Sequence, residues 1–154
     1  MSKDVRSSFR NLTGNQNFID KGISATIYGP FIWKDKKCAL KQILYSPGIL
    51  TLKMKEEIIR QVNRCKELDN PHVVKVFEMW FRPPALNVLM EYAEGKSLDK
   101  IIHPADPSPP FELKIVPNWA LQMADGMRYL HEKDIVHRNL KASNGLYSVS
   151  VINC

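Results

Sequence analysis

The hydrophobic pattern of this 154-residue chain changes period at Leu52, and that change limits the folds open to it. From Phe18 to Ile43 short apolar runs are rich in β-branched and aromatic residues, as in β-strands. From Leu52 to Leu68 the apolar side chains recur instead at intervals of three and four, with charges on the other face, which predicts an amphipathic helix. Two further strand-like segments follow, at 73–81 and 86–92.

Turn residues divide the strand-like regions. Gly29-Pro30 predicts a bulge or a strand break, because proline lacks a ladder donor and glycine adopts unusual dihedrals. Asp35-Lys36-Lys37 is expected to form a hairpin turn. Asp69-Asn70-Pro71 should end the helix, because the residue before a proline disfavours the helical conformation. Arg82-Pro83-Pro84 joins the last two strands.

The remaining part of the chain is expected to hold one more helix. Glu94-Gly95 and the proline-rich stretch 104–110 are connectors. A helix should begin near Val116, with Pro117 in its first turn. Its apolar stripe is predicted to consist of Ala120, Met123, Met127 and Leu130. A short hairpin is expected at 146–152, and the polar first seventeen residues are interpreted as a tail.

The composition is that of a globular protein, with 44% hydrophobic and 25% charged residues. The net charge of +6 comes from basic residues spread along the chain, without a dense block, so neither a nucleic-acid nor a membrane partner is expected. Cys38, Cys65 and Cys154 are far apart and odd in number, which argues against a disulfide framework or a zinc site. No apolar run is long enough to span a bilayer, so we expect a cytoplasmic location.

One polar run carries catalytic character: His137-Arg138-Asn139, followed by Lys141 and Asn144. It resembles the catalytic loop of protein kinases, H-R-D-x-K-x-x-N, with Asn139 at the position of the catalytic aspartate. In that family the aspartate accepts the proton of the substrate hydroxyl as it attacks the γ-phosphate. An amide has no basic carboxylate for this proton. Lys141 matches the serine/threonine pattern rather than the tyrosine pattern.

Two further segments resemble the same family. Cys38-Ala39-Leu40-Lys41 is similar to the V-A-I-K strand, in which the lysine pairs with the α/β-phosphates of ATP. Lys41 would take this role, and Ala39 would leave room beneath the adenine. Val88–Gly95 is similar to the hinge, with Met90 at the gatekeeper position. The backbone of Glu91 and Ala93 would then hydrogen-bond the adenine.

The resemblance covers residues 18–152, and several stretches are most similar to the mitogen-activated protein kinase kinase kinases. It implies an α+β fold: a tail at 1–17, a kinase small lobe at 18–90 with an antiparallel sheet and one helix, and a hinge at 91–95. A partial helical large lobe would occupy 96–154. Because no Asp-Phe-Gly follows the catalytic loop, we expect a domain truncated there.

Three positions depart from the family pattern. The Gly-rich loop should lie near 21–26, where only Gly22 is a glycine, so a close backbone cradle for phosphate is not expected. Gln61 stands where the helix should offer a glutamate to Lys41. Glu57, one turn earlier on the same face, would substitute if the helix shifted along its axis. Asn144 would ligate a magnesium ion, but it lacks the aspartate partner that such a site favours.

These observations leave three interpretations open. The leading one is a kinase-domain chain that partly keeps an ATP cleft, with ATP and Mg implied by the resemblance, and whose catalysis is impaired or absent. The second is an active serine/threonine kinase of which this sequence is an incomplete record. The third is a non-enzymatic interaction module, in which a partner protein covers the apolar face of the helix at 116–130.

Overall fold

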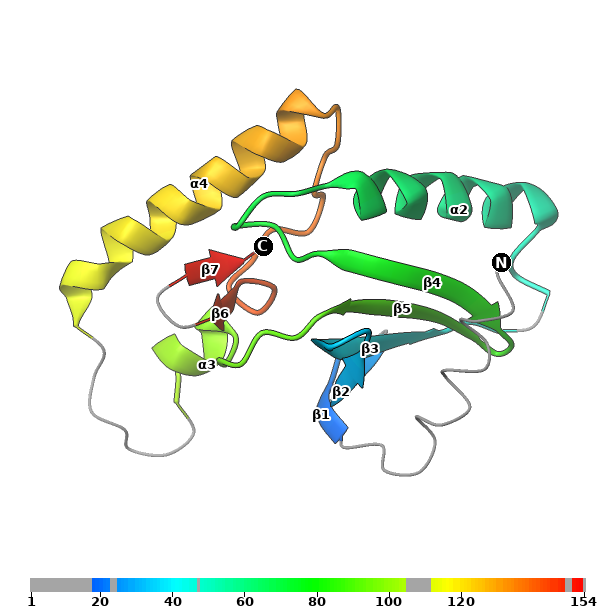
Figure 1. The fold of residues 1–154 in the computed structure, drawn as a ribbon, viewed down its shortest axis with the longest axis horizontal. Coiled ribbons are helices and arrows are strands. Elements are labelled where there is room, and N and C mark those ends of the chain that lie inside the picture. The colour runs from blue at the N-terminus through cyan, green and yellow to red at the C-terminus, as the bar shows by residue number, and fades with distance from the viewer. Residues whose placement is uncertain (1–17, 23–24, 47, 105–111, 149–150, 154) are drawn as a thin grey trace. The chain divides into compact units, whose positions relative to one another are not determined.

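The computed structural model describes residues 18–22, 25–46, 48–104, 112–148 and 151–153. Five strands form one antiparallel sheet in the order β1-β2-β3-β5-β4 (Figure 1). The elements are β1 (Phe18–Lys21), β2 (Ala25–Trp33), β3 (Lys36–Leu44), α2 (Leu52–Glu67), β4 (Val76–Arg82) and β5 (Ala85–Glu91). The predicted α+β order of three strands, a helix and two strands is confirmed.

The remaining elements are mainly helical. They are α3 (Leu98–Ile102), the 3₁₀ turn η2 (Leu113–Ile115), α4 (Val116–Glu132), β6 (Leu146–Ser148) and β7 (Val151–Asn153). The chain divides into two compact units. The first contains the five-stranded sheet and α2, and it ends at Tyr92. The second begins at Ala93 and also includes the segment Asp69–Val74.

Gly29-Pro30 forms a bulge within β2. The prediction of a bulge or a strand break at this pair is therefore confirmed, in favour of the bulge. The register between β2 and β3 shifts between Tyr28 and Phe31. Gly29 has a φ of +145°, a conformation that is almost restricted to glycine. A Cβ atom at Gly29 would lie 3.1 Å from the carbonyl oxygen of Cys38 on β3. The glycine therefore allows the two strands to stay paired on both sides of the bulge.

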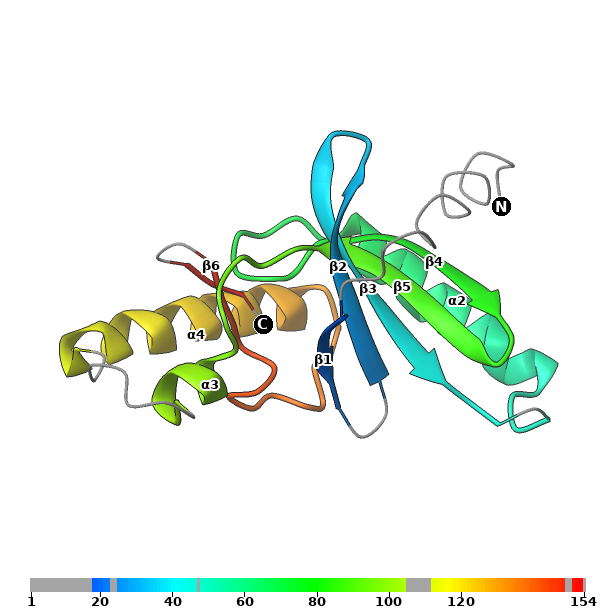
Figure 2. The same cartoon turned by 90° about the horizontal axis from the view of Figure 1, so that it is seen from below.

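The turn between β2 and β3 lies one residue earlier than predicted. Lys34 and Asp35 form it, with φ values of 49° and 62°, and β3 already begins at Lys36. Two consecutive positive φ values are those of a type I′ turn, whose twist matches that of the flanking strands. The hairpin projects from the sheet in Figure 2. The twist of the flanking strands favours this turn, although neither Lys34 nor Asp35 is a glycine.

The prediction that a strand begins at Val73 is wrong, because β4 begins at Val76. Asn70 turns the chain before that point. Its side-chain oxygen accepts a hydrogen bond from the His72 N–H at 2.7 Å, and its carbonyl accepts one from the Val73 N–H at 3.1 Å. Local hydrogen bonds of this kind compete with the strand ladder.

The predicted helix at 52–68 is confirmed as α2. Thr51 caps its N-terminus, with the hydroxyl oxygen accepting from the Met54 N–H at 3.2 Å. Ile58, Val62 and Cys65 of the predicted stripe are half-buried. The helix runs beside β4 (Figure 1), and the Lys66 ammonium lies 2.9 Å from the Glu78 carboxylate of that strand.

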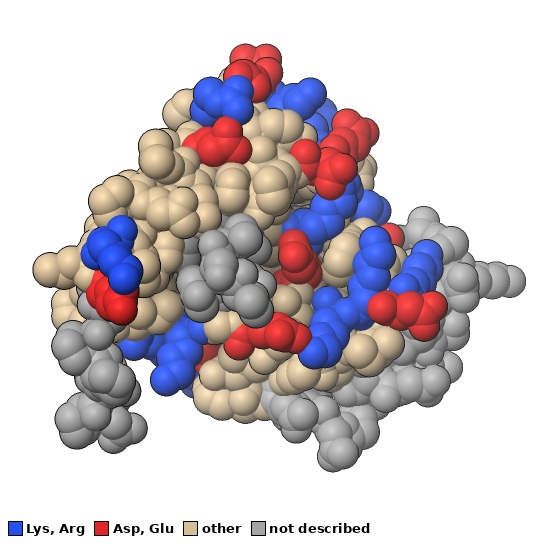
Figure 3. All heavy atoms as spheres, turned by 60° about the vertical axis from the view of Figure 1, so that its left-hand side comes forward, with Lys and Arg blue, Asp and Glu red and all other residues tan. Residues whose placement is uncertain are grey.

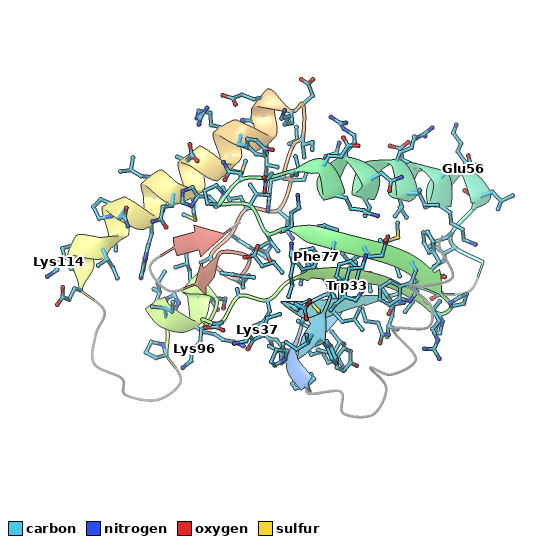
Figure 4. The ribbon with its side chains drawn as sticks, in the orientation of Figure 1. Trp33, Lys37, Glu56, Phe77, Lys96 and Lys114 are labelled. Carbon is cyan, nitrogen blue, oxygen red and sulfur yellow. The ribbon has the colours of Figure 1, made fainter. Side chains whose placement is uncertain are left out.

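One face of the sheet carries the core of the first unit. Phe31, Cys38, Leu40 and Leu89 are buried there. Four partly buried aromatic side chains pack against them: Tyr28, Trp33, Phe77 and Trp80. The rings of Trp33 and Phe77 stack with their centroids 5.7 Å apart, and Figure 4 labels both. Aromatic packing thus closes this face, and the opposite face of β3 presents Ala39 and Lys41.

α4 confirms the second predicted helix and most of its predicted stripe, because Leu130 is buried and Met123 and Met127 are half-buried. Its buried residues are Trp119, Gly126 and Leu130. Trp119 packs with Leu98 of α3, Met123 lies against this pair, and Ala120 is exposed. The prediction that Ala120 belongs to the apolar stripe is therefore wrong, because the larger Trp119 buries more apolar surface. The final hairpin is confirmed as β6 and β7.

Charged residues of both signs are interspersed on the face of the molecule that Figure 3 shows. No helix among the described residues is long and apolar enough to cross a membrane.

Candidate functional site

Lys41 lies in the middle of β3, the third strand of the sheet. Its register partners are Ile27 on β2 and Val88 on β5. The side chain is half-buried, and within the described ranges its ammonium group forms no ion pair. A cation that is partly desolvated and unneutralised is suited to attract an anionic ligand.

Ala39 and Met90 lie directly opposite one another on β3 and β5. Ala39 is 4% exposed and shares the Lys41 face of its strand, because side chains two residues apart point the same way. Met90 is half-buried. The structure therefore places Ala39, Lys41 and Met90 on one face of the sheet.

Glu91 is the last residue of β5, and both its backbone and its side chain form hydrogen bonds with Lys75. Its N–H donates to the Lys75 carbonyl at 2.8 Å, and its carboxylate accepts from the Lys75 N–H at 3.3 Å. Ala93, the other predicted hinge residue, belongs to the second unit. Lys75 was not singled out from the sequence, because only the folded backbone places it beside Glu91.

Gly22 lies at the turn between β1 and β2. Its N–H donates to the Ala25 carbonyl at 2.8 Å, so this donor is used inside the hairpin. A Cβ atom at Gly22 would meet only the Ala25 carbonyl oxygen, at 3.7 Å, an ordinary contact. Gly22 thus lacks the free amide that binding a phosphate oxygen requires.

Gln61 and Glu57 are bound to each other on the exposed face of α2. The Gln61 amide donates to Glu57 at 3.1 Å, and Arg60 forms an ion pair with the same carboxylate. Hydrogen bonds from Arg60 and then Gln61 lower the pKa of Glu57. The helix therefore offers its carboxylate to a neighbour on the same helix, and the structure shows no pairing of Gln61 or Glu57 with Lys41.

The loop with His137, Asn139 and Asn144 lies in the second unit and is held by its own hydrogen bonds. The Asn144 side-chain amide donates to the Asn139 carbonyl at 2.7 Å, and the Asn139 N–H donates to His137 Nδ1 at 3.3 Å. Arg138, between them, has a φ of 62°. The Asn139 side chain is exposed. Lys141 follows the turn, and its carbonyl accepts from the Asn144 N–H at 2.9 Å.

α3 supports this loop, and the sequence prediction missed that helix. The Leu98 N–H donates to the Gly145 carbonyl at 2.8 Å, and the Asp99 N–H donates to the Ala142 carbonyl at 3.2 Å. Gly145 is buried against Leu98, whose Cδ1 would lie 3.0 Å from an added Cβ. Ser97 at the N-cap and Asp99 in the first turn were the available signal, in a helix of only five residues.

The residues that the structure describes do not form a magnesium site by themselves. Among the described residues, no three His, Cys, Asp or Glu side chains gather where they could hold a metal ion. Because the Asn144 NH₂ group donates to Asn139, its side-chain oxygen remains as a single neutral acceptor. Magnesium favours sites that include a carboxylate beside phosphate oxygens.

Comparison with known proteins identifies relatives over most of the chain. A family model described as the protein kinase domain matches residues 15–152. Mitogen-activated protein kinase kinase kinase 7 of Homo sapiens is 32% identical over 115 residues, covering 73% of this chain and 18% of the relative. Mitogen-activated protein kinase kinase kinase mlk-1 of Caenorhabditis elegans is 31% identical over 99 residues, 64% of this chain and 9% of the relative. A receptor-like protein kinase of Ipomoea nil is 30% identical over 129 residues, 82% of this chain and 11% of the relative. The chain thus spans less than a fifth of the length of these relatives.

Proposed function

The chain belongs to the protein kinase family, resembling its mitogen-activated protein kinase kinase kinases, and we propose that it binds ATP weakly and does not transfer phosphate. Asn139 carries this proposal. The hydrogen bonds from Asn144 to Asn139 and from Asn139 to His137 keep the loop ordered around this position. An ordered loop therefore presents an amide where the reaction needs a carboxylate base.

The loss of the base is substantial in magnitude. General base catalysis contributes roughly 10²- to 10⁴-fold in rate. Phosphoryl transfer depends further on positioning and on charge stabilisation. Gly22 has its N–H committed to Ala25, and Gln61 is committed to Glu57, so two groups that would position phosphate are compromised as well. These losses are not additive, but any two of them would make turnover hard to detect.

The groups that would hold the nucleotide are better preserved. Lys41 supplies an unneutralised cation for the phosphates, Ala39 leaves room for the adenine, and Met90 lies opposite it. The backbone of Glu91 and Ala93 would hydrogen-bond the adenine. Bound Mg-ATP would supply the transferable phosphoryl group, but among the described residues only the Asn144 oxygen would face the metal. Because the groups for nucleotide binding are better preserved than those for metal binding and catalysis, we expect weak ATP binding without turnover.

A thermal-shift titration with Mg-ATP tests nucleotide binding, because a ligand that binds only the folded state raises its stability. The melting temperature of the wild type should rise with Mg-ATP concentration, and that of Lys41→Met should not. Lys53→Met, an exposed lysine on α2, is the matched control and should behave as the wild type does. Equal responses of Lys41→Met and wild type would refute the proposed site.

A protein partner on α4 is the second function that we propose. Leu121 of α4 is 70% exposed, and Leu113 of the turn η2, which directly precedes the helix, is 77% exposed. Exposed apolar surface of this kind favours association with another protein. Binding of a hydrophobic dye to the folded chain, reduced in Leu113→Ser/Leu121→Ser, is the expected result. A sharp melt without dye binding would contradict it.

We also propose a cytoplasmic location, supported by three widely spaced cysteines, of which Cys38 is fully buried as a free thiol. Fractionation of cells that express the tagged chain tests it. Recovery with the membrane fraction would contradict the proposal.

A further inference from the structure

The hydrogen bonds between Glu91 and Lys75 depart from a regular antiparallel ladder. In a hydrogen-bonded pair the two residues exchange both N–H···O=C bonds. The Glu91 N–H does donate to the Lys75 carbonyl, at 2.8 Å. The Lys75 N–H, however, donates to Oε2 of the Glu91 side chain, at 3.3 Å, in place of the Glu91 carbonyl. The Glu91 carboxylate thus accepts the hydrogen bond from the Lys75 N–H that the Glu91 carbonyl would accept in a regular ladder.

The neighbouring strand does not engage the Glu91 carbonyl either. Glu91 lies opposite Cys38 of β3, and the next residue, Tyr92, donates its N–H to the Lys37 carbonyl at 3.3 Å. Hydrogen-bonded and non-hydrogen-bonded pairs alternate along an antiparallel ladder, so Glu91 and Cys38 form a non-hydrogen-bonded pair. Neither β3 nor the Lys75 N–H therefore donates a hydrogen bond to the Glu91 carbonyl, which stays available as an acceptor.

We propose that the Glu91 carboxylate is a positioning group that keeps the Lys75 N–H occupied and thereby reserves the Glu91 carbonyl for the 6-amino group of an adenine nucleotide. This inference rests on the proposed nucleotide site. It extends that site to the Glu91 side chain, which would act through the main-chain carbonyl and so set the preference for a 6-aminopurine. A carbonyl already accepting from Lys75 would be a poorer partner for the amine.

The predicted selectivity follows from donor and acceptor chemistry. An amine at C6 donates to the Glu91 carbonyl, whereas a purine with hydrogen at C6 leaves that carbonyl without a partner. A site built to pair a polar group discriminates against the ligand that lacks it. The side chain must also be long enough: glutamate reaches the Lys75 amide, glutamine retains an oxygen at the same length, and aspartate is one methylene shorter.

The test compares dissociation constants, by calorimetry, for ATP and for purine riboside triphosphate, which lacks the 6-amino group. Wild type should prefer ATP by about tenfold, the value of one hydrogen bond of typical strength. Glu91→Gln should keep this preference, and Glu91→Asp should reduce it to about twofold or less. Glu56→Asp, the same substitution at an exposed position of α2, is the matched control and should keep the preference. If Glu91→Asp does not fold, Glu91→Met, of similar length but without an oxygen, replaces it with the same expectation.

Each outcome decides the inference. An undiminished preference in the folded short or apolar variant overturns it, and so does an equal weakening of both nucleotides with the preference intact, which is what a merely structural role would give. Wild type that binds both nucleotides equally overturns this inference alone. Wild type that binds neither overturns the proposed nucleotide site and the inference with it.

Discussion

The hydroxyl of Tyr129 on α4 accepts a hydrogen bond from the Asp69 N–H at 2.9 Å. One turn earlier on the same helix, Asp125 accepts a hydrogen bond from the Asn70 side-chain amide at 3.3 Å. Hydrogen bonds from Arg128 and then from Asn70 lower the pKa of Asp125. These contacts explain why Asp69–Val74, which joins α2 to β4 in sequence, belongs to the unit that contains α4.

Tyr129→Phe should lower the free energy of unfolding by about 1 kcal/mol, because it leaves the Asp69 N–H without this acceptor. Urea denaturation followed by circular dichroism measures the change. Leu121→Ala, on an exposed position of the same helix, should change stability by less than about 0.5 kcal/mol. Equal effects of the two substitutions would show that the hydroxyl does not anchor the segment.

Glu78 should make the stability of the first unit depend on pH. Burial disfavours its charged form, but hydrogen bonds from Lys66 and from the Met79 N–H outweigh burial, and the pKa of Glu78 is lowered. A carboxylate with a lowered pKa stabilises the fold above its unfolded pKa, and this contribution is lost as the pH falls through the folded value.

The melting temperature of Glu78→Gln should therefore fall below that of wild type at pH 7, and the difference should shrink below about pH 4. Glu67→Gln, an exposed residue at the end of α2, is the control and should show a small difference at both pH values. A wild-type advantage that stays constant down to pH 3 would contradict the assignment.

Gly29→Ala should destabilise the sheet by about 1–3 kcal/mol, because a Cβ is strained at that φ value and meets the Cys38 carbonyl. Gly48→Ala provides the comparison, since Gly48 also has a positive φ, of +86°, but has nothing within 4 Å of the added atom. Denaturation midpoints of both variants measure the two effects. Gly29→Ala should cause the larger loss of stability, and an equal loss would mean that the close approach of β3 costs nothing.

Much of the fold was predictable because its signals are local in the sequence. The change of hydrophobic period at Leu52 separates the strands from α2, and the Gly29-Pro30 pair locates the bulge. The start of β4 was mispredicted because Asn70 hydrogen-bonds nearby backbone groups, which competes with strand pairing. α3 was missed because five residues are too few for a periodic pattern.

The candidate site was predictable in its residue types but not in its contacts. The motif positions of Lys41 and Asn139 follow from their neighbours in sequence. The use of the Gln61 amide by Glu57 depends on side-chain conformations, which spacing alone does not determine. The contact between Lys75 and Glu91 joins residues that only the paired strands bring together. Trp119 rather than Ala120 is buried. The sequence did not distinguish them, because neighbouring apolar residues on this helix define more than one candidate face.

Transfer of labelled γ-phosphate from Mg-ATP to a generic serine/threonine substrate tests the central proposal most directly. The purified 154-residue chain is compared with Asn139→Asp and with Lys41→Met, which removes the cation for the phosphates. We predict that wild type gives no more label than Lys41→Met. Metal-dependent labelling of serine or threonine by wild type, abolished in Lys41→Met, would contradict the account.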